Sequence, residues 1–387
     1  MAERIQYSLT WILLLTYLVF QPVYKYFEYV NGWAHINISA ILFIMLFCLL
    51  VLKSLDIDFG CSDVYLMAFV LLVYVTVIQL VSLPWVLEFS TQMTYLKTTS
   101  RSLMGYWIFW IIGGYFPKII SSPYYRQILL ILWLAVTGAI IANALSNPLA
   151  FALILDRQSI YLLLADAYAL FTLLLIFGLH SSFFRIIVAI VAMITLFGMW
   201  SRTSFYAFLA VFMLYLWQNN RGMLLVTIAA LVALFFNGLG DIANERMLRI
   251  ITGGSDRSLS MRAHILQTGL MELDRVWLLG QFMGDVEYKM GSSGYYIHNY
   301  LSFWRQFGLI PFLILVLLAG YNFLLIGLRW IRYQLDTQGS ILFYVTTFIV
   351  IEIVISRSFL HPYIWFSLAA IPSYLEQNPL SGRCEIR

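Results

Sequence analysis

The sequence is a succession of apolar stretches, most of them about as long as a helix that crosses a lipid bilayer. A helix needs about 20 mostly apolar residues to span the hydrocarbon core. Because lipid offers the backbone no hydrogen-bonding partner, such stretches cross the membrane as helices. We therefore predict an all-α, polytopic integral membrane protein, with residues 1–387 forming a single transmembrane domain.

The composition excludes several other classes. Hydrophobic residues make up 62% of the chain and charged residues only 11%, whereas soluble domains carry roughly a quarter charged residues. A soluble enzyme, a nucleic-acid-binding protein and a disordered protein are thereby excluded. The formal net charge of +4 is small, and the scattered basic residues are typical of topology signals. Membrane lipids, and no nucleic acid, are the expected surroundings.

The apolar stretches predict about 12 transmembrane helices. Their expected ranges are 8–24, 36–52, 64–84, 102–120, 127–145, 159–179, 184–200, 202–217, 223–240, 299–328, 340–356 and 358–375. More basic residues fall in the inner connections when the N-terminus is placed in the cytoplasm. We read the first stretch as a retained span, since no small-residue cleavage site follows it.

One polar segment interrupts this pattern, residues 241–297 between the ninth and tenth spans. With nine spans before it, this large loop is expected to face outward. Apolar residues at helical spacing in 260–273 predict an amphipathic helix within it, so short helices are expected in the loop. Glycines in the following stretch indicate turns. Long ordered loops in compact proteins are usually functional, so we look for the site here.

The candidate site residues are polar residues at the outer ends of the predicted spans or in this loop. They are Ser201, Arg202, Arg257, Arg262, His298, Asn299 and Arg305. Glycines at 280 and 308 accompany them. His298 is the sole histidine that we place at an outer helix start.

This order of residues resembles the O-antigen polymerase and O-antigen ligase superfamily. The resemblance rests on Ser201-Arg202 opening a middle span, on Arg262 leading a loop helix, and on Gly280 closing the run Trp277-Leu278-Leu279-Gly280. The His298-Asn299 pair before a span, with Gly308 downstream, completes it. It covers roughly residues 200–310. The family usually has nine residues between the His-Asn pair and the glycine, and this chain has eight.

The resemblance implies a glycosyltransferase whose donor is an undecaprenyl-diphosphate-linked oligosaccharide. A sugar hydroxyl would attack the anomeric carbon, and the lipid diphosphate would leave. The residue chemistry suits this reaction, because an arginine is always charged and can hold a diphosphate with two hydrogen bonds. We assign that role to Arg202 and Arg262, with Arg257 as the rival of Arg262. His298 is the expected general base, since histidine is the side chain that can be neutral near pH 7.

Asn299 is expected to orient or cap rather than to react, and Ser201 to support the site. No acidic cluster with metal-ligand spacing lies in the loop, so we expect no metal and no cofactor, and direct attack would invert the anomeric centre. The simpler interpretations remain open. Arg202 could extend to lipid headgroups, Arg262 could face solvent, and His298 could be a plain helix-start residue.

Buried charges form a second group of candidates. Arg305 lies seven residues after His298, two turns along one helix face, and a charge at that depth suggests a partner or a site. It could contact the diphosphate, lower the pKa of His298, or pair with one of two buried acids, Asp166 and Glu352. Glu352 and Arg357 form another possible pair. We favour structural pairing over catalysis for both acids.

The leading function is polymerisation of lipid-linked repeat units into O-antigen or a related surface polysaccharide. Donor and acceptor would both be undecaprenyl-diphosphate-linked oligosaccharides, at the periplasmic face of the bacterial inner membrane. The resemblance also implies a chain-length regulator protein as partner. The alternatives are an O-antigen ligase that transfers the glycan to lipid A core, a protein oligosaccharyltransferase, and a transporter for the lipid-linked sugar.

Overall fold

A computed structural model gives the arrangement of most of the chain. It describes residues 2–31, 38–54, 62–82, 89–122, 124–146, 160–199, 201–236, 257–284 and 297–378. Across these ranges the secondary structure is helical, and no strand occurs. The all-α fold class predicted from the sequence is therefore confirmed. About half of the predicted large loop 241–297 falls within the described ranges, namely 257–284 and residue 297.

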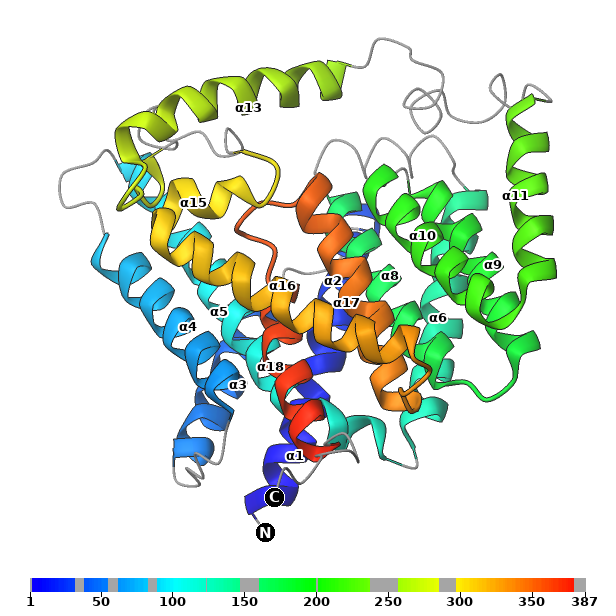
Figure 1. Ribbon diagram of the computed structural model, residues 1–387. Helices are drawn as coiled ribbons and strands as arrows, with labels where there is room; N and C mark the ends of the chain where they lie inside the picture. The colour runs from blue at the N-terminus through cyan, green and yellow to red at the C-terminus, as the bar shows by residue number, and fades with distance from the viewer. Residues whose placement is uncertain are drawn as a thin grey trace, which may run out of the picture.

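Figure 1 shows how the helices are arranged along the chain. Their bounds are α1 Ala2–Leu15, the π-helix η1 Thr16–Phe20, α2 Gln21–Asn31, α3 Ile38–Ser54, α4 Asp63–Val81, α5 Phe89–Ile120, α6 Tyr125–Ser146, α8 Ile160–Gly178, α9 Ser182–Gly198, α10 Arg202–Asn219, α11 Arg221–Phe236, α13 Arg257–Val276, α15 Leu301–Phe307, α16 Leu309–Ile331, α17 Thr337–Ile355 and α18 Tyr363–Gln377.

Six of the described helices are long and apolar enough to cross a membrane. They are Gln6–Glu28, Asp63–Val81, Gln92–Ile120, Tyr125–Asn143, Leu309–Ile331 and Thr337–Ile355. Two shorter apolar helices, Leu162–Gly178 and Ser182–Gly198, also coincide with predicted spans. The structure thus supports a membrane protein with several spans, and the number twelve stays a prediction.

The helix ends gather at two opposite ends of the molecule. In Figure 1, α13 lies across the end opposite the start of α1. At the α1 end, hydrogen bonds join connections that are distant in sequence: the Gln338 amide donates to Ser121 Oγ at 2.8 Å, and the Gln218 amide donates to the Trp330 carbonyl at 3.4 Å. Successive connections therefore alternate between the two ends, as expected for a chain that crosses a bilayer repeatedly.

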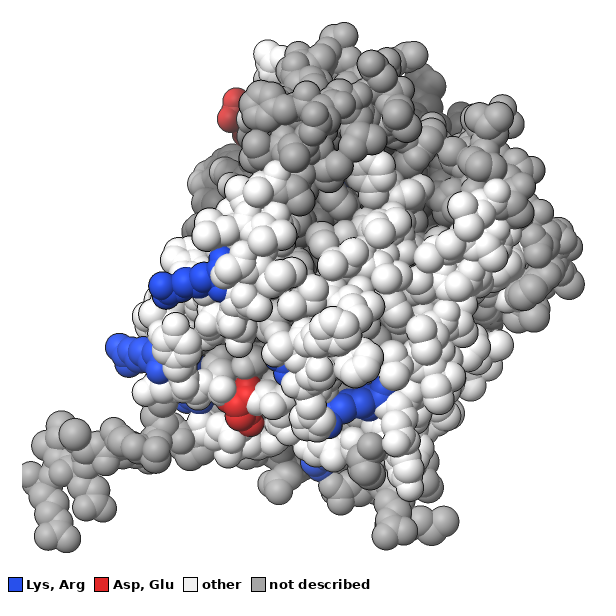
Figure 2. All heavy atoms as spheres, turned by 90° about the vertical axis from the view of Figure 1, so that its right-hand side faces the viewer, with Lys and Arg blue, Asp and Glu red and all other residues white. Residues whose placement is uncertain are grey.

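The outer surface of the bundle is apolar. Figure 2 shows a broad uncharged face on the side formed by α6, α9 and α11, with most of the described charges in its lower half and one acidic side chain at its upper edge. Large apolar side chains are exposed there, among them Phe183, Ile190, Ile194 and Leu225. Water would oppose such a surface, whereas lipid tails accept it without cost. This face is therefore suited to contact lipid.

The centre of the bundle is held by aromatic packing between α5 and α18. Phe109 meets Tyr363 edge to face with ring centroids 4.7 Å apart, and Phe116 meets Phe366 in the same way at 4.8 Å. Such pairs add to the packing energy of the buried area. The firmly packed α18 fixes the short connection 356–362 that precedes it, and the candidate site lies at this connection.

The predicted tenth span, 299–328, is wrong as a single helix. The chain forms the short helix α15, breaks at Gly308 and continues as α16. Gly308 has φ +91°, and Gly280 in the preceding turn has φ +71°. An added Cβ on Gly308 would lie 2.7 Å from the Leu279 carbonyl carbon, and one on Gly280 would lie 2.8 Å from the Gln306 carbonyl carbon. The two backbones thus touch where only glycine fits.

We predict that Gly308→Ala and Gly280→Ala each destabilise the protein by about 2 kcal/mol or more, because an alanine must adopt positive φ and also meet backbone atoms. The measurement is thermal unfolding of detergent-purified protein. Gly138→Ala in α6 is the matched control, since its Cβ would meet nothing within 4 Å. Equal melting temperatures for all three variants would contradict the prediction.

Candidate functional site

A buried arginine organises the polar residues at the α13 end of the bundle. Arg357 is only 7% exposed. One of its terminal nitrogens forms an ion pair with Asp166 of α8, lies 3.5 Å from Glu352 Oε1 of α17, and donates to Ser204 Oγ of α10 at 3.3 Å. The Ser204 hydroxyl also donates to Asp166 at 2.5 Å. Two carboxylates from different helices thus surround one guanidinium.

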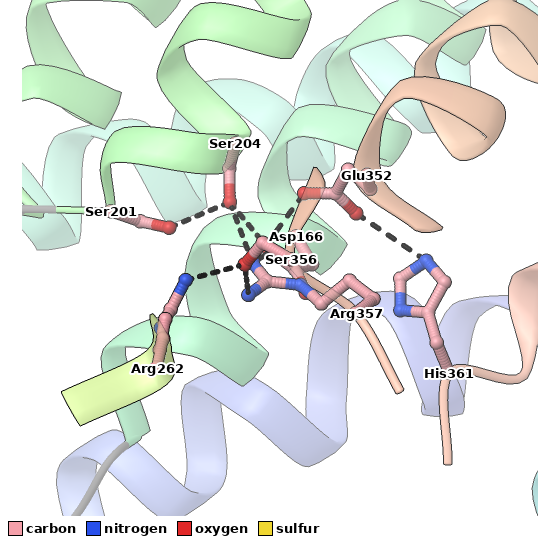
Figure 3. A network of polar contacts seen from close by, with 8 residues as sticks. All are labelled: Asp166, Ser201, Ser204, Arg262, Glu352, Ser356, Arg357 and His361. Atoms are coloured by element: carbon pink, nitrogen blue, oxygen red, sulfur yellow. Dashed lines mark hydrogen bonds and ion pairs between the residues drawn. The ribbon is translucent and has the colours of Figure 1, made fainter. Parts of the chain in front are cut away.

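A second arginine joins this cluster from the amphipathic helix α13. Figure 3 shows Arg262 pointing toward Ser356, beside Arg357. The Arg262 guanidinium donates to Ser356 Oγ at 3.1 Å, and the Arg357 guanidinium donates to the same oxygen at 3.3 Å. Two positive charges therefore share one hydroxyl. Arg262 is half-buried and Arg357 is buried, so Arg262 is the arginine nearer to solvent.

His298 lies within the field of both arginines. It precedes α15 and is half-buried. Burial and the charges of Arg262 and Arg357 lower the pKa of its imidazole to about 4. Each of these effects opposes the protonated form. The imidazole of His298 is therefore neutral at physiological pH.

The neighbours of His298 fix its position. Ile297 is buried against Gly269 of α13, where an added Cβ would lie 2.5 Å from the Ile297 side chain. Asn299, which precedes the N-cap residue Tyr300, accepts from the Leu301 backbone N–H through its Oδ1 at 3.0 Å and so helps to fix the first turn of α15. Ser302 Oγ accepts from the Phe359 N–H at 2.6 Å. These contacts tie the histidine to α13 and to the connection 356–362.

A second histidine lies at the same end, so the expectation that His298 stands alone there is wrong. His361 precedes α18, and its Nε2 lies 3.4 Å from Glu352 Oε2 (Figure 3). Two carboxyl groups and one imidazole thus lie around one buried guanidinium.

The described residues include one group with ligand atoms close enough to share a metal ion. Single ligand atoms of Asp166, Glu352 and His361 lie within 4.8 Å of one another. Arg357 is already paired with both carboxylates. A cation would have to displace this guanidinium or be repelled by it. The donor set therefore suits an ion-pair cluster better than a metal centre.

The remaining predicted residues are placed as follows. Ser201 is buried, and its hydroxyl lies 2.7 Å from Ser204 Oγ, within the Arg357 cluster. Arg202 opens α10 as predicted and is half-buried, but the charges that act on His298 are those of Arg262 and Arg357. Arg257 opens α13, and its side chain lies outside the described part of the structure.

Arg305 has neither of the partners predicted for it. It lies in α15 and is 4% exposed, and both its Nε and a terminal nitrogen donate to Glu272 Oε2 of α13, at 3.0 and 2.7 Å. Asp166 and Glu352 pair with Arg357 instead. The two-turn spacing from His298 was misleading, because His298 precedes the helix rather than belonging to it. Arg305 therefore fastens α15 to α13.

Sequence reasoning missed part of the cluster. It considered Arg357 only as a partner of Glu352, and it did not single out Ser204, Ser356 or His361. The available signal was the stretch from Ser356 to His361, in which polar residues interrupt two apolar spans. A second signal was Ser204, one helical turn after Ser201.

Comparison of the chain with known proteins adds no assignment: no protein-family model matches it, and no curated protein matches it.

The presence of two carboxyl groups around one buried guanidinium leads to a stability prediction. Arg357→Gln should lower the free energy of unfolding by about 3–5 kcal/mol, because it leaves buried carboxylates without their cation. Glu352→Gln should cost much less, since Asp166 still neutralises Arg357. Thermal unfolding in detergent measures both, with the exposed Arg332→Gln as control. A Glu352→Gln loss equal to that of Arg357→Gln would contradict the charge count.

Proposed function

We propose that the protein is a glycosyltransferase that polymerises undecaprenyl-diphosphate-linked oligosaccharide units into O-antigen or a related surface polysaccharide. The proposal places the reaction at the periplasmic face of the bacterial inner membrane. It needs no metal and inverts the anomeric carbon. The resemblance of residues 200–310 to O-antigen polymerases and ligases motivates it, and the arrangement around His298 supports it.

The observation that carries the proposal is a neutral histidine on which the charges of two arginines act. Arg262 and Arg357 present positive charge where a diphosphate would develop negative charge. Both charges help to lower the pKa of His298, which therefore remains unprotonated near neutral pH. A general base and fixed cations at one place are what displacement of a diphosphate by a hydroxyl requires.

The reaction can be followed atom by atom. His298 accepts the proton of an acceptor hydroxyl as that oxygen forms a bond to the anomeric carbon of the donor sugar. The bond between this carbon and the diphosphate oxygen breaks, and the electron pair leaves with the lipid diphosphate. Arg262, and behind it Arg357, stabilise that charge. The imidazolium then returns its proton to solvent.

An apolar groove beside the site supports a lipid-linked substrate. Its volume is about 370 Å³, and it lies between α16, α17 and α18. Tyr300, two residues after His298, lines one part, and His361 and Ser358 line another. The other lining residues are mostly apolar. A groove of this kind suits a hydrocarbon chain whose polar head reaches the arginines.

Two other functions remain as candidates. A ligase or a protein oligosaccharyltransferase would use the same histidine and arginines and would differ in its acceptor. A transporter for the lipid-linked sugar is favoured by one observation, the buried cluster of Asp166, Glu352 and Arg357. Buried ionisable groups commonly mark transport pathways in membrane proteins.

The test supplies the purified protein in detergent with a lipid-diphosphate-linked repeat unit alone and reads the products as a ladder on a gel. The expected result is a ladder that disappears with His298→Ala. The matched control is His264→Ala, an exposed histidine on α13, which should leave the ladder intact. Transfer only after lipid A core is added would make the protein a ligase. No transfer to any acceptor would favour the transporter.

The pH dependence of the reaction tests the role of His298. The base form is lost as pH falls through the pKa, so the acid limb of kcat/KM should lie near 4 rather than near 6.5, the ordinary value of histidine. Arg262→Gln removes one cause of the lowered pKa, so it should move this limb to higher pH in the residual activity. An acid limb that Arg262→Gln does not move would contradict the assignment.

A further inference from the structure

A short turn after α13 exposes three large apolar side chains in succession. Trp277 is 50% exposed, Leu278 42% and Leu279 76%. The residues just before it, Asp274 and Arg275, are charged and exposed. Exposed apolar patches of this kind mark contact surfaces rather than solvated ones.

The backbone of this turn is fixed to the start of a transmembrane helix. The N–H of Leu309, the first residue of α16, lies 3.0 Å from the Trp277 carbonyl and 3.2 Å from that of Leu278. The close backbone contact between Gly280 and Gly308 also fixes the turn against the start of α16. Figure 1 shows this end of α13 beside α15, at the end of the bundle opposite the start of α1. The turn therefore lies at the level of the first residues of α16.

The exposed face of α16 is apolar from its first turn onward. Ile310, Leu313 and Leu317 are all exposed. The helix has 23 residues, so its length of about 34 Å is close to the roughly 30 Å of the hydrocarbon core. A tilt of the helix would shorten its reach along the bilayer normal. The hydrocarbon boundary therefore lies within about one turn of Leu309.

From this geometry we propose that the Trp277–Leu279 turn is an interfacial anchor, inserted among the lipids of the leaflet at the α13 end. Its apolar side chains continue the lipid-facing surface of α16, which identifies lipid as the occupant. Tryptophan is enriched at this level of membranes. The charged Asp274 and Arg275 then lie at the headgroups.

The anchor sets the height of α13, and with it Arg262, relative to the bilayer. The helix is fastened to α15 through Glu272 and Arg305 and to the lipid through the turn that follows it. Arg262 is thereby held near the headgroup level, where a lipid-linked phosphate would also lie. The anchor itself does not depend on the proposed transferase activity.

The test measures the depth of nitroxide labels by electron paramagnetic resonance, without any substrate. Cys48, Cys61 and Cys384 are first replaced by serine. Leu279→Cys is then labelled in vesicles of phosphatidylethanolamine and phosphatidylglycerol. Accessibility to oxygen, which concentrates in lipid, is compared with accessibility to a water-soluble nickel chelate.

Two labelled variants calibrate the result. Leu317→Cys, on the exposed middle of α16, gives the value in lipid, and Gln267→Cys, on the exposed side of α13, gives the value in water. The oxygen-to-nickel ratio at position 279 is expected to lie nearer that of position 317. A ratio nearer that of position 267 would overturn the anchor and leave the transferase proposal untouched.

Discussion

A guanidinium removed from water needs anions close to it, and Arg357 finds them on two helices that are distant in sequence. Asp166 comes from α8 and Glu352 from α17, with Ser204 of α10 bridging the arrangement. Removing one partner of the cluster would leave a buried charge uncompensated, which is costly because the charge is no longer solvated by water. The helices are therefore held in one relative position. That position presents Ser356 to Arg262, and so determines where the amphipathic helix α13 docks.

The second constraint is mechanical and lies in the backbone. Gly280 and Gly308 let the turn after α13 touch the break between α15 and α16. The break separates α15 from α16, and His298, which precedes α15, lies where the charges of Arg262 and Arg357 act on it. The ion pair of Arg305 with Glu272 stabilises the same junction. Electrostatic pairing and close backbone contact thus act together on one short stretch of chain.

Local patterns predicted local structure well. Hydropathy located the apolar helices, and apolar periodicity located α13. The same reasoning failed where partners come from elsewhere in the chain. Nothing in the sequence around Arg305 indicates Glu272, and helical spacing suggested a false relation between Arg305 and His298. The break at Gly308 was missed because an apolar run hides a backbone conformation that only a contact with Gly280 explains. From the sequence, Arg357 was considered only as a partner of Glu352. Its effect on His298 depends on the packing of α17 and α18, which the sequence does not reveal.

Under the proposed function, the low pKa of His298 has a consequence for the order of events. An anionic diphosphate beside Arg262 would favour the imidazolium and raise the pKa by about one to three units. A histidine that began near its ordinary value of about 6.5 would then be protonated and useless as a base. Beginning near 4, it reaches at most about neutrality when the donor is bound, where it is still partly unprotonated and is a stronger base than before. The arginines would therefore do more than hold the diphosphate: together with burial, they keep the histidine a weak base in the empty site, and the bound donor would make it a stronger one.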